Sequence, residues 1–175
     1  MEQYTYSLER YTLCFSFYSG IDEVDDGTHS LSKKDLDDYF GIQGSICFLK
    51  GEPNLFLSHV PKPVPPIYSF WTKVLKLSDE EIKAHEINDG HIYLNLLFEK
   101  FKNILSTHNI TREKVAYIEK TFDMACTVQI YSYGDIIPGY YLLKEQIQLI
   151  ASLQAGIDIS TLPKNRMFLL NGIDY

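Results

Sequence analysis

Imidazole side chains are the first groups of this chain that could carry chemistry, because imidazole binds metals and transfers protons near neutral pH. The histidines do not show the His-Glu-x-x-His spacing that places two imidazoles on one helix face, and no Cys-x-x-Cys pair accompanies them. Residues 22–27 are acidic enough to suggest a calcium loop, but Lys33 stands at the twelfth position, where a bidentate glutamate belongs. The sequence therefore predicts no metal site. The histidines are His29, His59, His85, His91 and His108.

Nucleophilic and nucleotide-dependent chemistry has no support in the sequence either. There is no Gly-x-Ser-x-Gly elbow and no glycine loop of the Walker or dinucleotide type. Cys14 and Cys126 lie in alternating apolar runs, where we expect small buried hydrophobic residues and not nucleophiles. We therefore predict a protein that is not an enzyme and uses no cofactor. A small hydrolase that pairs a carboxylate with His29 or His91 stays open as the alternative.

Carboxylates are concentrated near the N-terminus. The formal net charge is −7, from 16 lysines and arginines against 23 aspartates and glutamates. Residues 1–40 alone hold three basic and nine acidic residues, a net charge of −6. Such an asymmetry steers a basic partner toward one side of a protein, and it argues against direct binding of nucleic acid, which needs a basic footprint. The candidate partner-binding carboxylates are Asp22, Glu23, Asp25, Asp26, Asp35, Asp37 and Asp38.

Tyrosines are the second candidate binding groups, since the chain contains 13 of them and several fall outside the expected core stripes. Tyrosine supplies a large contact area at a small entropy loss and is enriched in binding hot spots. We predict that Tyr131 and Tyr133 contribute to binding a partner. The alternative is that they border the core with their hydroxyls in water.

Local patterns predict the elements that position these groups. Apolar and polar residues alternate over residues 11–18 and again over residues 125–133, which is typical of strands. Ser32 can cap a helix over residues 32–40, and Gly41 can end it in the left-handed conformation. Cap signals and apolar periodicity predict further helices from Ser78, over residues 92–107, over residues 110–122 and over residues 140–155.

The two halves of the chain repeat one plan. Each has a strand, a loop, a helix, a Gly-Ile pair (Gly41-Ile42 and Gly156-Ile157) and a further strand. A length of 175 residues favours one domain. We therefore predict a single α+β domain over residues 1–175, with one sheet, helices mainly on one face, and two strand–loop–helix–strand units.

Four prolines within residues 61–66 predict an extended, polyproline-like segment. Whether this segment is a stiff crossing within the domain or a ligand for an SH3-type module stays open. No apolar run approaches the ~18 residues of a membrane-spanning helix, and the N-terminus lacks the basic start and apolar core of a signal peptide. Together with three cysteines that we expect to be reduced thiols, this predicts a cytoplasmic protein without membrane contact.

Several segments within residues 11–160 carry a resemblance to a known family. They are Leu31-Ser32-Lys33-Lys34-Asp35-Leu36-Asp37-Asp38-Tyr39-Phe40-Gly41-Ile42, Lys50-Gly51-Glu52, Trp71, the long helix through Phe98, and Leu153-Gln154-Ala155-Gly156-Ile157-Asp158-Ile159. They resemble a bacterial family of small domains, some of whose members lie beside polymorphic toxin genes as immunity proteins. The chain is also similar to immunity proteins of contact-dependent growth inhibition systems. It departs from the family pattern at Gln43-Gly44, where relatives tend to carry a proline and a hydroxyl residue.

The resemblance implies a non-catalytic inhibitor that binds and neutralises a cognate toxin domain. A nuclease toxin has a basic cleft because it binds phosphates, and carboxylates of the inhibitor can take the place of those phosphates. We therefore expect the cognate toxin domain to be basic and to be a nuclease whose active site is occluded.

Overall fold

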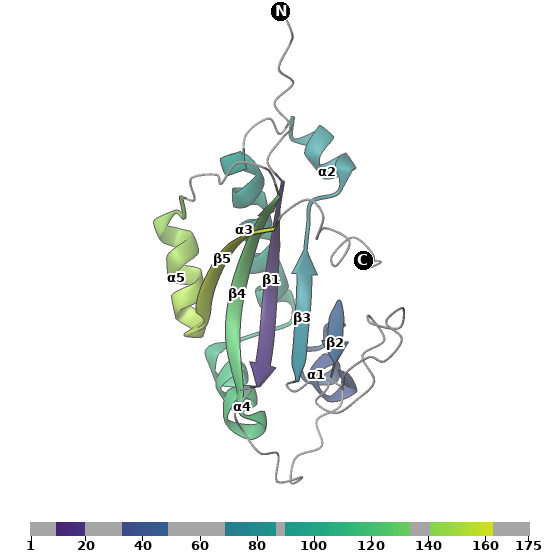
Figure 1. The fold of residues 1–175 in the computed structure, drawn as a ribbon, viewed down its shortest axis with the longest axis vertical. Coiled ribbons are helices and arrows are strands. Elements are labelled where there is room, and N and C mark those ends of the chain that lie inside the picture. The colour runs from purple at the N-terminus through teal and green to yellow at the C-terminus, as the bar shows by residue number, and fades with distance from the viewer. Residues whose placement is uncertain (1–9, 20–32, 49–68, 87–89, 134–140, 163–175) are drawn as a thin grey trace, which may run out of the picture.

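The computed structural model describes residues 10–19, 33–48, 69–86, 90–133 and 141–162. Within these residues the strands form one open mixed sheet in the order β2-β3-β1-β4-β5 (Figure 1). The central strand β1 is antiparallel to both β3 and β4, and the edge strand β5 is parallel to β4. The predicted α+β class with a single sheet is confirmed. The strands are β1 (Arg10–Ser19), β2 (Ile46–Phe48), β3 (Phe70–Leu75), β4 (Met124–Tyr133) and β5 (Gly156–Leu162).

Four of the five helices in the described residues begin within two residues of the predicted positions because their start signals are local. The helix predicted over residues 140–155 spans only Lys144–Leu153, and no side-chain hydrogen bond caps its start. Thr111 caps one helix by accepting a hydrogen bond from the backbone N–H of Lys114, and Ser78 starts another with a complete capping box. Ser32 and the proline-rich residues 61–66 lie outside the described residues. None of the helices in the described ranges is long and apolar enough to cross a membrane. The helices are α1 (Lys33–Phe40), α2 (Asp79–Ala84), α3 (Gly90–Thr107), α4 (Arg112–Phe122) and α5 (Lys144–Leu153).

An aromatic cluster joins the sheet to the helices on one face. Phe15 and Phe17 of β1 point to the side on which Figure 1 shows α3, α4 and α5 behind the sheet. The ring of Phe17 stacks on Phe40 of α1 at 5.1 Å, and Phe15 meets Phe101 of α3 at 5.5 Å. Trp71 of β3, fully buried, completes the cluster at 5.4 Å from Phe40. This cluster positions α1 against the β3 side of the sheet.

The opposite face of the sheet carries a short polar row. The hydroxyl of Ser16 lies 2.8 Å from that of Thr72 on β3 and donates to the side-chain carbonyl of Gln129 on β4 at 3.0 Å. Cys14 and Val74 form a small apolar cluster on the same face. Ser16 and Thr72 are both buried, so their mutual hydrogen bond avoids the free-energy penalty of an unsatisfied polar group.

The two predicted strand–helix–strand units share their order of elements but not their place in the sheet. In the second unit, β4 and β5 are parallel neighbours. In the first unit β1 and β2 also run parallel, since both are antiparallel to β3, but β3 lies between them. The strand β3, which belongs to neither unit, therefore separates β1 from β2, whereas no strand separates β4 from β5.

Candidate protein-binding surface

Helix α1 turns a buried face to the core and an acidic face outward. Leu36 and Phe40 are completely buried, whereas Asp35 and Asp38 are exposed. The helix ends because Gly41 adopts φ +66° and the N–H of the next residue donates to a carbonyl five residues earlier, at 3.1 Å. This is the glycine-terminated ending that the sequence predicts. The short helix therefore holds two of the predicted carboxylates in solvent.

Asp37 is turned inward, unlike its two acidic neighbours on α1. Its Oδ1 accepts hydrogen bonds from the indole N–H of Trp71 and from the backbone N–H of Gly44, each at 2.8 Å. Burial lowers the pKa of Lys73, and the Asp37 carboxylate partly offsets that shift. Asp37, which the sequence predicts as a partner-binding residue, therefore ties α1 to β3 and to the turn after α1.

A stacked pair of tyrosines lies between α1 and α4. The rings of Tyr39 and Tyr117 are 5.0 Å apart and within 17° of parallel, and Lys114 Nζ lies 5.9 Å from the Tyr39 ring centroid. Burial, together with the neighbouring Tyr117 hydroxyl, raises the pKa of Tyr39. Tyr117 is 49% exposed. We call Asp35, Asp38, Tyr39, Lys114 and Tyr117 the α1–α4 surface. Tyr117 is not among the binding residues predicted from the sequence, because nothing in its local pattern places it beside a residue 78 positions away.

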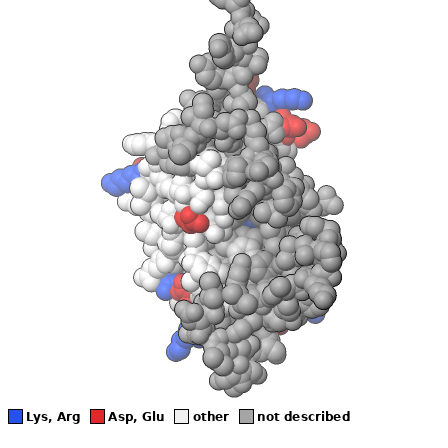
Figure 2. Space-filling view, viewed as in Figure 1, with Lys and Arg blue, Asp and Glu red and all other residues white. Residues whose placement is uncertain are grey.

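The other predicted binding residues are not brought to this surface by the described part of the structure. Tyr131 lies on the opposite face of the sheet from the aromatic core, packed against the Cys14–Val74 cluster. Burial, with Cys14 and Asp158 nearby, raises the pKa of Tyr131 to about 12, so its hydroxyl stays neutral. Figure 2 shows that the described carboxylates on the sheet face turned to the viewer are few and separated by uncharged surface. Asp22, Glu23, Asp25, Asp26 and the side chain of Tyr133 lie outside the described residues.

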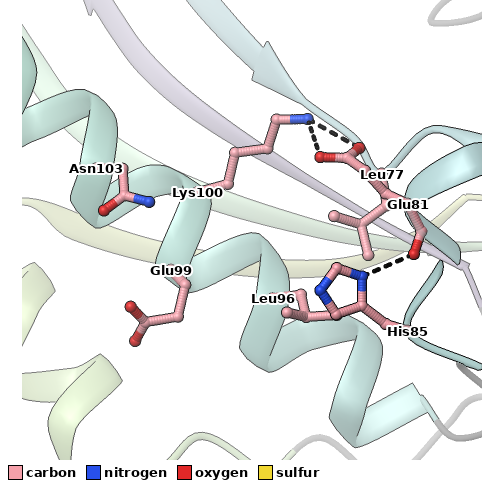
Figure 3. A pocket seen from close by; sticks show the side chains of 7 residues that line it. All are labelled: Leu77, Glu81, His85, Leu96, Glu99, Lys100 and Asn103. Atoms are coloured by element: carbon pink, nitrogen blue, oxygen red, sulfur yellow. Dashed lines mark hydrogen bonds and ion pairs between the residues drawn. The ribbon is translucent and has the colours of Figure 1, made fainter.

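A cavity of about 190 Å³ lies between α2 and α3 and is lined by several titratable side chains (Figure 3). Glu81 of α2, His85 just after that helix, and Glu99 and Lys100 of α3 line it. The Glu81 carboxylate accepts from the backbone N–H of Ser78 at 2.7 Å and from Lys100 Nζ at 3.1 Å. These partners lower the pKa of Glu81, the Ser78 hydrogen bond most strongly. The cavity is smaller than the ~300–1,000 Å³ of typical small-molecule sites. The carboxylate of Glu81 is already bound by Ser78 and Lys100, so it stabilises the fold.

We expect Glu81 to stabilise the fold in a pH-dependent way. Because its pKa is lowered on folding from the ordinary 4.5, its contribution is fully present above that value and disappears as the pH falls through the lowered value. Thermal unfolding at neutral pH should therefore show a lower midpoint for Glu81→Gln than for the native chain, and the two midpoints should converge as the pH falls through the lowered pKa of Glu81. Glu80→Gln, an exposed change on the same helix, is the control. A difference that persists unchanged at low pH would contradict the assignment.

The predicted catalytic groups of the hydrolase alternative are not assembled within the described residues. His91 is exposed on α3, where its ring meets Tyr141 edge-on at 6.3 Å, and His29 lies outside the described ranges. Burial raises the pKa of Cys14 to about 12 and that of Cys126 still further. Both thiols therefore stay protonated near neutral pH, and they are buried as the sequence predicts. No cluster of three or more metal-ligating side chains occurs among the residues that were described.

No family model, no curated protein and no solved structure matches this chain. The geometry defines the candidate site by itself, as a partly acidic helix surface with a stacked aromatic pair.

Proposed function

We propose that this protein is a non-catalytic inhibitor that binds a basic protein domain through the α1–α4 surface. The observation that carries this proposal is the exposure of Asp35 and Asp38 on α1 next to the stacked pair of Tyr39 and Tyr117. Exposed carboxylates beside an ordered aromatic pair offer steering charge and an anchor at one place.

The two kinds of group have different physical roles in such binding. Exposed carboxylates attract a basic partner over distance and raise the association rate. Tyr117 is already ordered by its stacking on Tyr39, so less side-chain freedom is lost when a partner covers it. A half-exposed, ordered tyrosine is therefore suited to slow dissociation, since aromatic anchors dominate interface energetics.

We propose further that the partner is a cognate toxin domain, a nuclease, and that binding occludes its active site in the bacterial cytoplasm. The support is the resemblance of residues 31–42 and the other quoted segments to immunity proteins, together with the net charge of −7. A nuclease cleft binds phosphates and is basic, so an acidic inhibitor is complementary to it.

The proposal expects a secreted protein with a toxin domain to be encoded beside this chain. The test uses that domain, purified and measured by stopped-flow association and surface dissociation. We expect Asp35→Asn with Asp38→Asn to slow association several-fold at low salt and to leave dissociation nearly unchanged. Tyr117→Ala should instead speed dissociation about 10-fold or more. Asp158→Asn, which removes an exposed carboxylate from the β5 edge of the sheet, is the matched control.

The N-terminal acidic segment is tested in the same assay. Replacing Asp22, Glu23, Asp25 and Asp26 by their amides removes four of the seven net negative charges. Association of this variant should be slower than that of the native chain at low salt. The difference between the two association rates should disappear as the salt concentration rises toward 1 M, where the Debye length is about 3 Å. The inhibitor should also abolish cleavage of a DNA or RNA substrate by the toxin domain. Kinetics of all variants equal to those of Asp158→Asn, or undiminished cleavage in the complex, would overturn the proposal.

A further inference from the structure

A larger cavity lies where the end of α3, the turn after it, the start of α4 and the end of α5 meet. Its volume is about 350 Å³, which falls within the ~300–1,000 Å³ range of small-molecule sites. Leu105, Ile110 and Leu153 line it, and all three are buried members of the main hydrophobic cluster. The cavity therefore opens onto the edge of the core, and a ligand bound there covers apolar surface.

The charged side chains that line this cavity are cations, Lys102 of α3 and Arg112 of α4, and no carboxylate lies among its lining residues. The guanidinium of Arg112 is already paired with the Glu119 carboxylate. The Lys102 side chain is exposed, and its ammonium makes no ion pair or hydrogen bond with any residue that the structure describes. The described wall therefore carries one positive charge without a partner.

Backbone carbonyls at the ends of α3 and α5 carry partial negative charge, which disfavours an anion nearby. Carbonyls that border the cavity already accept hydrogen bonds, which reduces this repulsion. The Leu105 carbonyl at the end of α3 accepts from the N–H of Ile110 at 2.8 Å. The Leu153 carbonyl at the end of α5 accepts from the Arg112 guanidinium at 3.2 Å. The cavity is therefore better suited to an anion than to a cation.

We propose that this cavity binds a small monocarboxylate with a short apolar chain. The chain lies on the wall that Leu105, Ile110 and Leu153 form. The carboxylate pairs with the Lys102 ammonium, and the Ser106 hydroxyl in the same wall is a further donor. One cation without a partner matches a single negative charge, which favours a carboxylate over a doubly charged phosphate. None of the residues that line the cavity belongs to the α1–α4 surface.

Hexanoate is the probe, and two-dimensional amide NMR of the full chain reports its binding. We expect saturable shifts at the amides of Leu105, Asn109 and Leu153, which line the cavity, with a dissociation constant in the millimolar range. Acetate lacks the apolar chain, and hexanol lacks the charge. The dissociation constants of both should be higher by about 10-fold or more. Inorganic phosphate should also bind more weakly than hexanoate.

Two variants test the two halves of the site. Lys102→Gln should raise the dissociation constant of hexanoate several-fold. Lys120→Gln removes the same charge from an exposed residue in the last turn of α4 and should leave that constant unchanged. Ser106→Phe keeps Lys102 but fills the cavity from an exposed position on α3, so the saturable shifts should be lost. Circular dichroism checks that each variant is folded.

Three results would each overturn the proposal: hexanoate produces no saturable shifts, hexanol or phosphate binds as tightly as hexanoate, or Lys102→Gln binds hexanoate as tightly as Lys120→Gln does. The carboxylate site and the proposed inhibitor function fail independently, because one is measured with hexanoate and the other with the toxin domain. A chain that binds the toxin domain but not hexanoate would remove only the carboxylate site. A chain that binds hexanoate but not the toxin domain would remove only the inhibitor function.

Discussion

Replacing Leu36 by alanine is expected to lower the free energy of unfolding by about 2–5 kcal/mol, the range of leucine-to-alanine changes in well-packed cores. Leu36 is fully buried and belongs to the main hydrophobic cluster. It lies on a helix of only eight residues, which is too short to persist without tertiary contacts. The change therefore removes apolar burial and also loosens the hold of α1 on the sheet.

Equilibrium unfolding in urea, followed by circular dichroism and by Trp71 fluorescence, measures this loss. Lys34→Ala lies two residues away on the exposed side of the same helix and should change the free energy of unfolding by no more than about 0.5 kcal/mol. An equally small effect for Leu36→Ala would show that Leu36 is not a core residue.

Replacing Asp37 by alanine is expected to lower the free energy of unfolding by about 2–4 kcal/mol, because two donors lose their acceptor at once. The indole N–H of Trp71 and the backbone N–H of Gly44 both donate to the same oxygen, Oδ1. Asp37→Asn keeps an oxygen at that position and should recover most of the loss. Asp38→Ala, at an exposed neighbour, should be close to neutral.

The same three variants separate structural from binding carboxylates. If Asp37 acts as the structure indicates, its alanine variant loses stability and its asparagine variant binds the toxin domain with unchanged kinetics. Asp38→Ala, in contrast, keeps its stability and binds more slowly. An Asp37→Ala variant as stable as the native chain would show that the bond to Trp71 contributes nothing and would return Asp37 to the predicted binding set.

Local signals account for the parts of the fold that the sequence predicts well. The long helix starts within two residues of its predicted position, and the caps at Ser78 and Thr111 form as expected. Alternation identifies both central strands to within one residue at each end. In each case the determining residues are neighbours along the chain, so no knowledge of tertiary contacts is needed.

Long-range contacts account for what the sequence does not predict. The pattern of Asp37 is that of any exposed helix residue, and only its bond to Trp71, 34 residues later, turns it inward. Ile147 belongs to the apolar spacing that predicts the helix over residues 140–155, yet it is 46% exposed on α5. Gln146 is buried in its place, because its amide accepts from the Leu143 N–H and donates to Asn95 of α3.

The position of β1 at the centre of the sheet has a consequence for how the chain folds as it is made. Its neighbours come much later in the sequence: Ser16 meets Thr72 across 56 residues and Gln129 across 113. At about 5–20 residues per second, a ribosome needs roughly 6–23 s to add those 113 residues. Until β4 has been made, β1 can pair with β3 but not with β4, and closing so long a loop also slows the folding step itself. The nascent N-terminal segment is therefore the part of this protein that a chaperone would bind first.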